Sequence, residues 1–188
     1  MPGKNALFVQ HSTPLSLSAF HSQAKYYWNI LQEEEPDLLK AYHTFSACRY
    51  IWPDQHRRIA SLLEVLGEVV QAFCKLLADP ALLPPSVAPN RYLLLATLQH
   101  MDEQIKILHP LIITFRSIHK SSSERVRKLR LEIEHNLELL VQSCQDSLKH
   151  FQVLSDQVHF EEKKQEQFAS NQPKPEASGK LYLLFELP

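Results

Sequence analysis

Apolar residues recur at intervals of three and four positions almost continuously from Leu15 to Phe168. This spacing places their side chains on one face of an α-helix, because the helix turns once every 3.6 residues. The alternating pattern that indicates strands is not evident before residue 180. We therefore predict an all-α protein, a four- or five-helix bundle with a long C-terminal helix and a short apolar tail.

Proline residues suggest where the first helices begin and end. We expect a first helix that ends before Pro36 and a short second helix that ends before Pro53, because proline interrupts the backbone hydrogen bonds of a helix. Proline is tolerated at the first helical position and Asp54 complements the helix dipole, so a third helix is predicted to start at about Pro53. Two adjacent apolar stripes on this third helix indicate contact with more than one neighbour and hence a central position.

Two longer helices are predicted to follow. Asn90 is a plausible N-cap for the fourth, whose apolar register continues through Pro110, so a kink is expected there rather than an end. Ser121 and Glu124 have the spacing of a capping box that opens the fifth helix. If this helix reaches Phe168 it is ~68 Å long, against ~38 Å for the third, and it extends beyond the bundle.

The predicted organisation has four parts. Residues 1–15 form an N-terminal extended segment and residues 16–168 the helical bundle. Residues 169–179 are polar and proline-containing, which favours a flexible linker. Residues 180–188 form a short apolar segment.

Composition argues against several function classes. The chain has only three glycines among 188 residues, and none lies in a phosphate-binding, dinucleotide-binding or G-x-S-x-G pattern. Its net charge of −1 provides no global field for nucleic acid, which makes nucleic acid an unlikely partner. No apolar run approaches the roughly 18 residues of a membrane span. Three widely separated cysteines fit a reducing compartment, so we expect a cytoplasmic or nuclear protein.

Ten histidines raise the question of a metal site. The one recognisable pattern is Glu132-x-x-His135, the spacing used in di-iron helix bundles. Such sites need a second copy of the motif, which the chain lacks, and His135 is expected to point outward from its helix. We therefore predict no catalytic residue, no metal and no cofactor. The other histidines show no ligand pairing in the sequence: His11, His21, His43, His56, His100, His109, His119, His150 and His159.

A cluster of basic residues lies around the turn between the last two predicted helices. It contains one acidic residue, Glu124, and the following six bases: Arg116, Lys120, Arg125, Arg127, Lys128 and Arg130. One interpretation is a solvated face paired with the acids that follow it. The other is docking on an acidic surface: a partner protein, the exterior of tubulin, nucleic-acid phosphates or anionic lipid.

Apolar residues near the end of the chain form the second candidate binding surface. The long helix is expected to carry apolar side chains past the reach of its neighbours, and the segment 180–188 is densely apolar. This segment either folds back into a groove of its own bundle or is offered to a partner. The predicted partner-binding residues are Phe151, Leu154, Val158, Leu181, Tyr182, Leu184 and Phe185.

These features favour a non-catalytic helical interaction or scaffold subunit of a larger intracellular assembly. Its expected partners are other proteins, in a hetero-complex or in a homo-oligomer through the C-terminal helix. The first alternative is a structural component of microtubule-based or ciliary machinery that docks through the basic cluster. The second alternative is a ferritin-like metal-dependent enzyme.

Overall fold

A computed structural model describes residues 16–48, 53–79, 83–118 and 123–171 of the chain. Within these ranges there are four α-helices, one short 3-10 turn and no strand. The prediction of an all-α bundle is therefore confirmed. The elements are α1 (Leu17–Ala47), α2 (Pro53–Ala78), the turn η1 (Pro85–Val87), α3 (Ala88–Ile118) and α4 (Glu124–Asn171).

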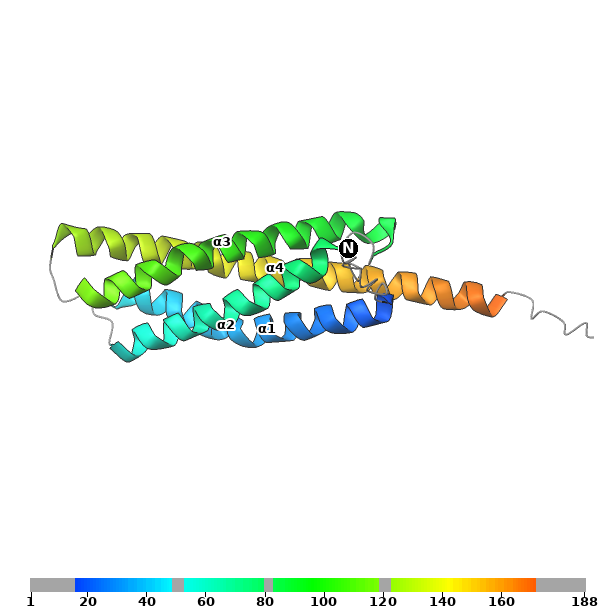
Figure 1. Cartoon of the computed structure of the whole chain (residues 1–188), viewed down its shortest axis with the longest axis horizontal. Coiled ribbons are helices and arrows are strands. Elements are labelled where there is room, and N and C mark those ends of the chain that lie inside the picture. The colour runs from blue at the N-terminus through cyan, green and yellow to red at the C-terminus, as the bar shows by residue number, and fades with distance from the viewer. Residues whose placement is uncertain (1–15, 49–52, 80–82, 119–122, 172–188) are drawn as a thin grey trace, which may run out of the picture.

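The four helices run alternately up and down and pack side by side along the long axis of the molecule (Figure 1). Among the described residues, α1 packs against α2 and α4, and α3 packs against the same two helices. Each helix thus has two neighbours, as in an up-down four-helix bundle. The prediction that the helix from Pro53 is central was wrong, since α2 occupies one of four equivalent corners.

Pro36 lies inside α1 and does not end it. The two helices predicted on either side of Pro36 are therefore one helix. Leu31 and Leu38 are both buried and seven residues apart, so the apolar stripe keeps its register across the proline. Pro110 lies inside α3, as predicted. Both prolines are exposed, so the carbonyl groups that lose a backbone donor can be hydrated.

The helix starts are set by serine caps in two cases. The Ser16 hydroxyl accepts a hydrogen bond from the Ala19 N–H at 3.2 Å. The Ser123 hydroxyl accepts one from the Val126 N–H at 3.4 Å at the start of α4, whereas Ser121 lies outside the described residues.

The predicted N-cap of the fourth helix was wrong. Asn90 lies within α3, which begins at Ala88 directly after the 3-10 turn. The turn carries Pro85 at its first position, where a missing backbone N–H has no cost.

The bundle core is one continuous cluster of aliphatic and aromatic side chains from all four helices. Aromatic contacts join helices that are distant in sequence. Phe73 of α2 lies between Tyr27 of α1, with ring centroids 5.6 Å apart, and Phe151 of α4, at 5.9 Å. Such pairs add about 0.5–1.5 kcal/mol each beyond area burial. These contacts hold α1, α2 and α4 together at the level of Phe73.

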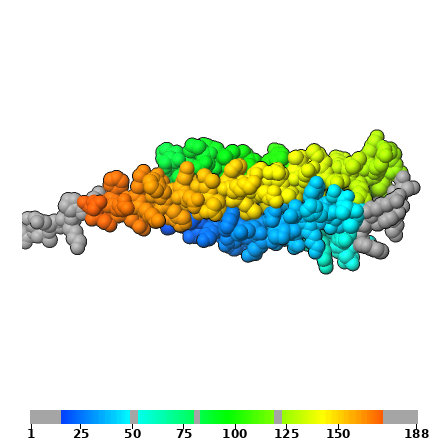
Figure 2. Space-filling model, turned by 180° about the vertical axis from the view of Figure 1, so that it is seen from behind, coloured from blue at the N-terminus to red at the C-terminus, as the bar shows by residue number. Residues whose placement is uncertain are grey.

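Helix α4 is the longest element, with 48 residues against 31 in α1 and α3 and 26 in α2. At about 1.5 Å per residue it spans roughly 72 Å. Its C-terminal part projects past the ends of the other three helices (Figures 1 and 2). The predicted overshoot is thus confirmed. The helix continues to Asn171, so residues 169–171 of the predicted linker are helical.

Over the stretches of chain that the structure describes, none of the helices combines the length and apolar character that crossing a membrane requires.

Candidate functional site

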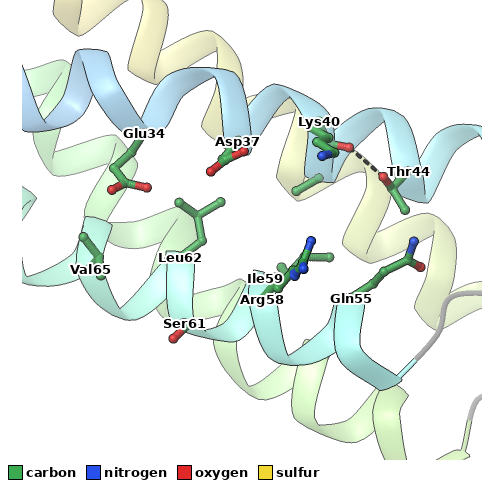
Figure 3. Close-up of a pocket in the computed structure, with 11 residues that line it drawn as sticks. Glu34, Asp37, Lys40, Thr44, Gln55, Arg58, Ile59, Ser61, Leu62 and Val65 are labelled. Carbon is green, nitrogen blue, oxygen red and sulfur yellow. Dashed lines mark hydrogen bonds between the residues drawn. The ribbon is translucent and has the colours of Figure 1, made fainter.

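A groove opens between α1 and α2 in the half of the bundle that contains the C-terminal part of α1 (Figure 3). We call it the α1–α2 groove. Its volume is about 470 Å³. Its lining consists of Glu34, Asp37, Lys40, Ala41, Thr44, Gln55, Arg58, Ile59, Ser61, Leu62 and Val65.

The α1–α2 groove combines an apolar floor with a charged rim. Ile59 and Leu62 line it from α2, and the Val65 side chain beside them is 42% exposed. On the rim, Glu34 and Asp37 lie toward one end of the groove, as Figure 3 shows. Lys40 and Arg58 lie further along the groove. A segment with apolar side chains between a positive and a negative group matches this arrangement.

The basic cluster is only partly a free surface. Arg125 and Lys128 are exposed on α4. Arg127 is also exposed but pairs with Glu124 in its own helix, at 2.7 Å. Arg116 is exposed in the last turn of α3. The sixth predicted base, Lys120, lies outside the described residues.

Arg130 has an intramolecular role. Its Nη2 donates a hydrogen bond to the backbone carbonyl of Phe45 at 2.7 Å, and it also contacts the carbonyl of Cys48. These carbonyls belong to the last turn and the C-cap of α1. Carbonyl groups at the end of a helix have no backbone N–H donor further along the helix. Arg130 thus binds the C-terminal end of α1 to α4, so its guanidinium is already engaged within the chain.

The apolar part of the predicted partner surface is buried where it can be described. Phe151, Leu154 and Val158 are at most 3% exposed, which contradicts the expectation that neighbouring helices could not cover them. The reason is that α1 is one long helix whose N-terminal half packs along this part of α4 (Figure 2). The other four predicted residues lie outside the described part of the chain: Leu181, Tyr182, Leu184 and Phe185.

Two histidines that are 138 positions apart in the sequence meet where α4 leaves the bundle. The rings of His21 on α1 and His159 on α4 are edge to face, with centroids 4.3 Å apart. His159 Nδ1 lies 3.3 Å from Glu162 Oε2, and His21 Nε2 forms a 2.8 Å hydrogen bond with the hydroxyl of Ser155. We call His21, His159 and Glu162 the His21 cluster.

The His21 cluster was not predicted from the sequence, because its two histidines belong to different helices. The one local signal was His159-x-x-Glu162, which places both side chains on one face of α4. The Glu132-x-x-His135 motif consists of two exposed side chains.

Of the two cysteines that contact the core, Cys144 is buried and Cys74 is half-buried. Burial raises the pKa of Cys144 to about 12 and that of Cys74 to about 11. Both therefore carry their proton at neutral pH, and a thiol in that state is a poor nucleophile.

Comparison with protein-family models, with curated proteins and with solved structures finds no match for this chain.

Proposed function

We propose that the protein is a non-catalytic interaction subunit that receives a short apolar segment of another chain in the α1–α2 groove. The observation that carries the proposal is the groove itself, with its apolar floor partly open between charged rims. Grooves between helices commonly bind apolar segments in this way. The proposal refines the predicted scaffold function by placing the binding surface at α1 and α2 rather than at the core-facing side of α4.

The proposed occupant is the segment 180–188 of a second copy of the chain. It carries the apolar run from Leu181 to Phe185 between Lys180 and Glu186. Lys180 complements Glu34 and Asp37 at one end of the groove. Glu186 complements the two cationic groups further along its rim. Covering this apolar run also removes an aggregation hazard.

The length of the chain favours binding between two copies over binding within one. Because His21 contacts His159, it marks a common level on α1 and α4. Asn171 lies twelve residues beyond His159, about 18 Å further along α4, and Asp37 lies about 24 Å from His21 in the opposite direction. Leu183, twelve residues past Asn171, reaches at most about 43 Å when fully extended. To enter its own groove, the segment must span the sum of the two lengths along α4 and α1, which requires it to be fully stretched. The groove of another copy imposes no such restriction.

A complementation experiment tests this proposal. The full chain is expected to self-associate in light scattering, and two changes should each weaken self-association at least about tenfold: Val65→Asp, which places a charge on the groove floor, and deletion of residues 180–188. Mixing the two variants should restore a heteromeric complex, because one supplies a segment and the other a groove. Burying an unpaired carboxylate costs well over the 1.4 kcal/mol that a tenfold change requires.

Val153→Asp on α4 is the matched control, since Val153 is 48% exposed, similar to Val65, but lies outside the groove. This variant should self-associate like the unmodified chain. A monomeric full chain that loses stability when residues 180–188 are deleted would show that the segment packs within one copy, and the proposal would fail.

A second candidate function is docking on an acidic protein surface such as that of microtubule-based or ciliary machinery. The observation in its favour is that Arg125, Arg127 and Lys128 are exposed together at the start of α4, near the end of α3. The contact would be electrostatic and therefore sensitive to salt.

Changing Arg125, Arg127 and Lys128 to glutamate is expected to leave the melting temperature nearly unaltered, because exposed charge pairs contribute only about 0–1 kcal/mol. Co-sedimentation with polymerised tubulin at low salt should fall strongly. Lys163 and Lys164, exposed at the opposite end of α4, provide the control when both are changed to glutamate. Equal sedimentation of the triple variant and the unmodified chain would reject this docking surface.

A further inference from the structure

The His21 cluster brings together three potential metal ligands from two helices. One ligand atom from each of His21, His159 and Glu162 lies within 4.8 Å of the other two. Two imidazoles and a carboxylate suit zinc, a borderline-soft divalent ion that binds nitrogen and oxygen donors at about 2.0–2.2 Å. The donor set is therefore chemically suitable.

The geometry needs little adjustment to bind such an ion. In a tetrahedral zinc site with bonds of about 2.1 Å, two ligand atoms lie about 3.4 Å apart. His159 Nδ1 and Glu162 Oε2 already lie 3.3 Å apart. The widest separation in the cluster must shorten by about 1.4 Å to meet that geometry. The side chains of His159 and Glu162 are partly exposed, so they can rotate to close this gap.

The environment of His21 supports metal binding through one further contact. The hydrogen bond to Ser155 occupies Nε2 and orients the ring, as a supporting contact does for ligating histidines. If Nδ1 binds the metal, this contact is kept.

We propose that His21, His159 and Glu162 bind one Zn²⁺ ion, with water in the fourth position. The ion ties the second turn of α1 to α4 at the level where α4 extends beyond the bundle. Zinc bound by ligands from two helices stabilises the folded state, because the unfolded chain does not present the three ligands together. This inference departs from the prediction of no metal, which considered only ligands close in sequence.

Isothermal titration of the full chain with zinc, after chelator treatment and without any affinity tag, tests the site. We expect one ion per chain. At zinc concentrations about 100-fold above the dissociation constant, the melting temperature should rise by about 5–10 °C. His159→Asn should weaken binding at least about tenfold and remove the shift in melting temperature. Its side chain is exposed, so the variant should still fold.

His135→Asn is the matched control, because His135 is an exposed histidine on the same helix and lies outside the cluster. It should bind zinc like the unmodified chain. Cobalt provides a second readout, since a tetrahedral site gives Co²⁺ an intense visible absorption that Glu162→Gln should reduce. Absence of saturable one-to-one binding, or zinc affinity within threefold of the unmodified chain in both His159→Asn and Glu162→Gln, would overturn the proposal.

Discussion

Phe151→Ala is expected to lower the free energy of unfolding by about 3–5 kcal/mol, as for other large-to-small changes of buried aromatic residues. Phe151 is 3% exposed and stacks on Trp28, with ring centroids 5.4 Å apart and planes 27° from parallel. It also contacts Phe73 in the same cluster. Its removal opens a cavity where three helices meet, which neighbouring side chains can fill only in part. Chemical denaturation monitored by circular dichroism measures the effect.

Phe160→Ala is the matched comparison on the same helix. Phe160 is 61% exposed, so its loss should change the free energy of unfolding by no more than about 0.5 kcal/mol. The contrary outcome is that Phe151→Ala leaves the free energy of unfolding nearly unchanged and impairs association with other chains. That result would contradict the burial of Phe151 and restore the prediction of a partner surface there.

Arg130→Met is expected to destabilise the fold by roughly 1.5–3 kcal/mol, the typical contribution of hydrogen bonds made by a charged group. The guanidinium holds the carbonyls of Phe45 and Cys48 at the end of α1. Methionine keeps much of the aliphatic stem but supplies no donor, so these carbonyls lose their partner. The positive charge that complements the C-terminal end of the α1 dipole is lost as well.

Arg125→Met is the control for Arg130→Met, because Arg125 lies on the same helix but its side chain is exposed. Its effect on stability should stay within about 0.5 kcal/mol. Equal destabilisation by the two substitutions, measured by urea denaturation, would show that Arg130 contributes only general charge and not a specific tie between α1 and α4.

Local periodicity was sufficient to predict the helices and most of the core. The apolar register that was expected to continue through Pro110 corresponds to seven residues of α3, all of them buried: Leu94, Leu98, Met101, Ile105, Leu108, Ile112 and Phe115. Helical side chains three and four positions apart share a face whatever the rest of the chain does. The start of α2 at Pro53 was predicted from the tolerance of proline at the first helical position, and the overshoot of α4 from the length of its apolar pattern.

The prediction that a helix ends before Pro36 was wrong because it followed only from the local effect of proline on helix hydrogen bonds. It did not take into account the apolar stripe that continues on both sides of Pro36. Proline interrupts one hydrogen bond, at a cost of about 3 kcal/mol in a helix interior. Burial of Leu31 and Leu38 on either side of Pro36 favours a continuous helix. Each such side chain contributes about 1.5–3 kcal/mol to the stability of the fold. Packing therefore outweighs the local cost. At Pro110 the continuous apolar register correctly predicted that the helix does not end.

The sequence by itself determined which residues form helices and which face of each helix is apolar, since both depend on neighbours within about one turn. Only the tertiary structure decided how far α1 covers α4. That alignment buries Phe151, brings His21 to His159 and places Arg130 at the end of α1. It results from packing between helices more than 80 positions apart in the sequence, and no spacing within either helix encodes it. The α1–α2 groove likewise is lined by side chains of two different helices, so it depends on their relative placement and not on either sequence segment alone.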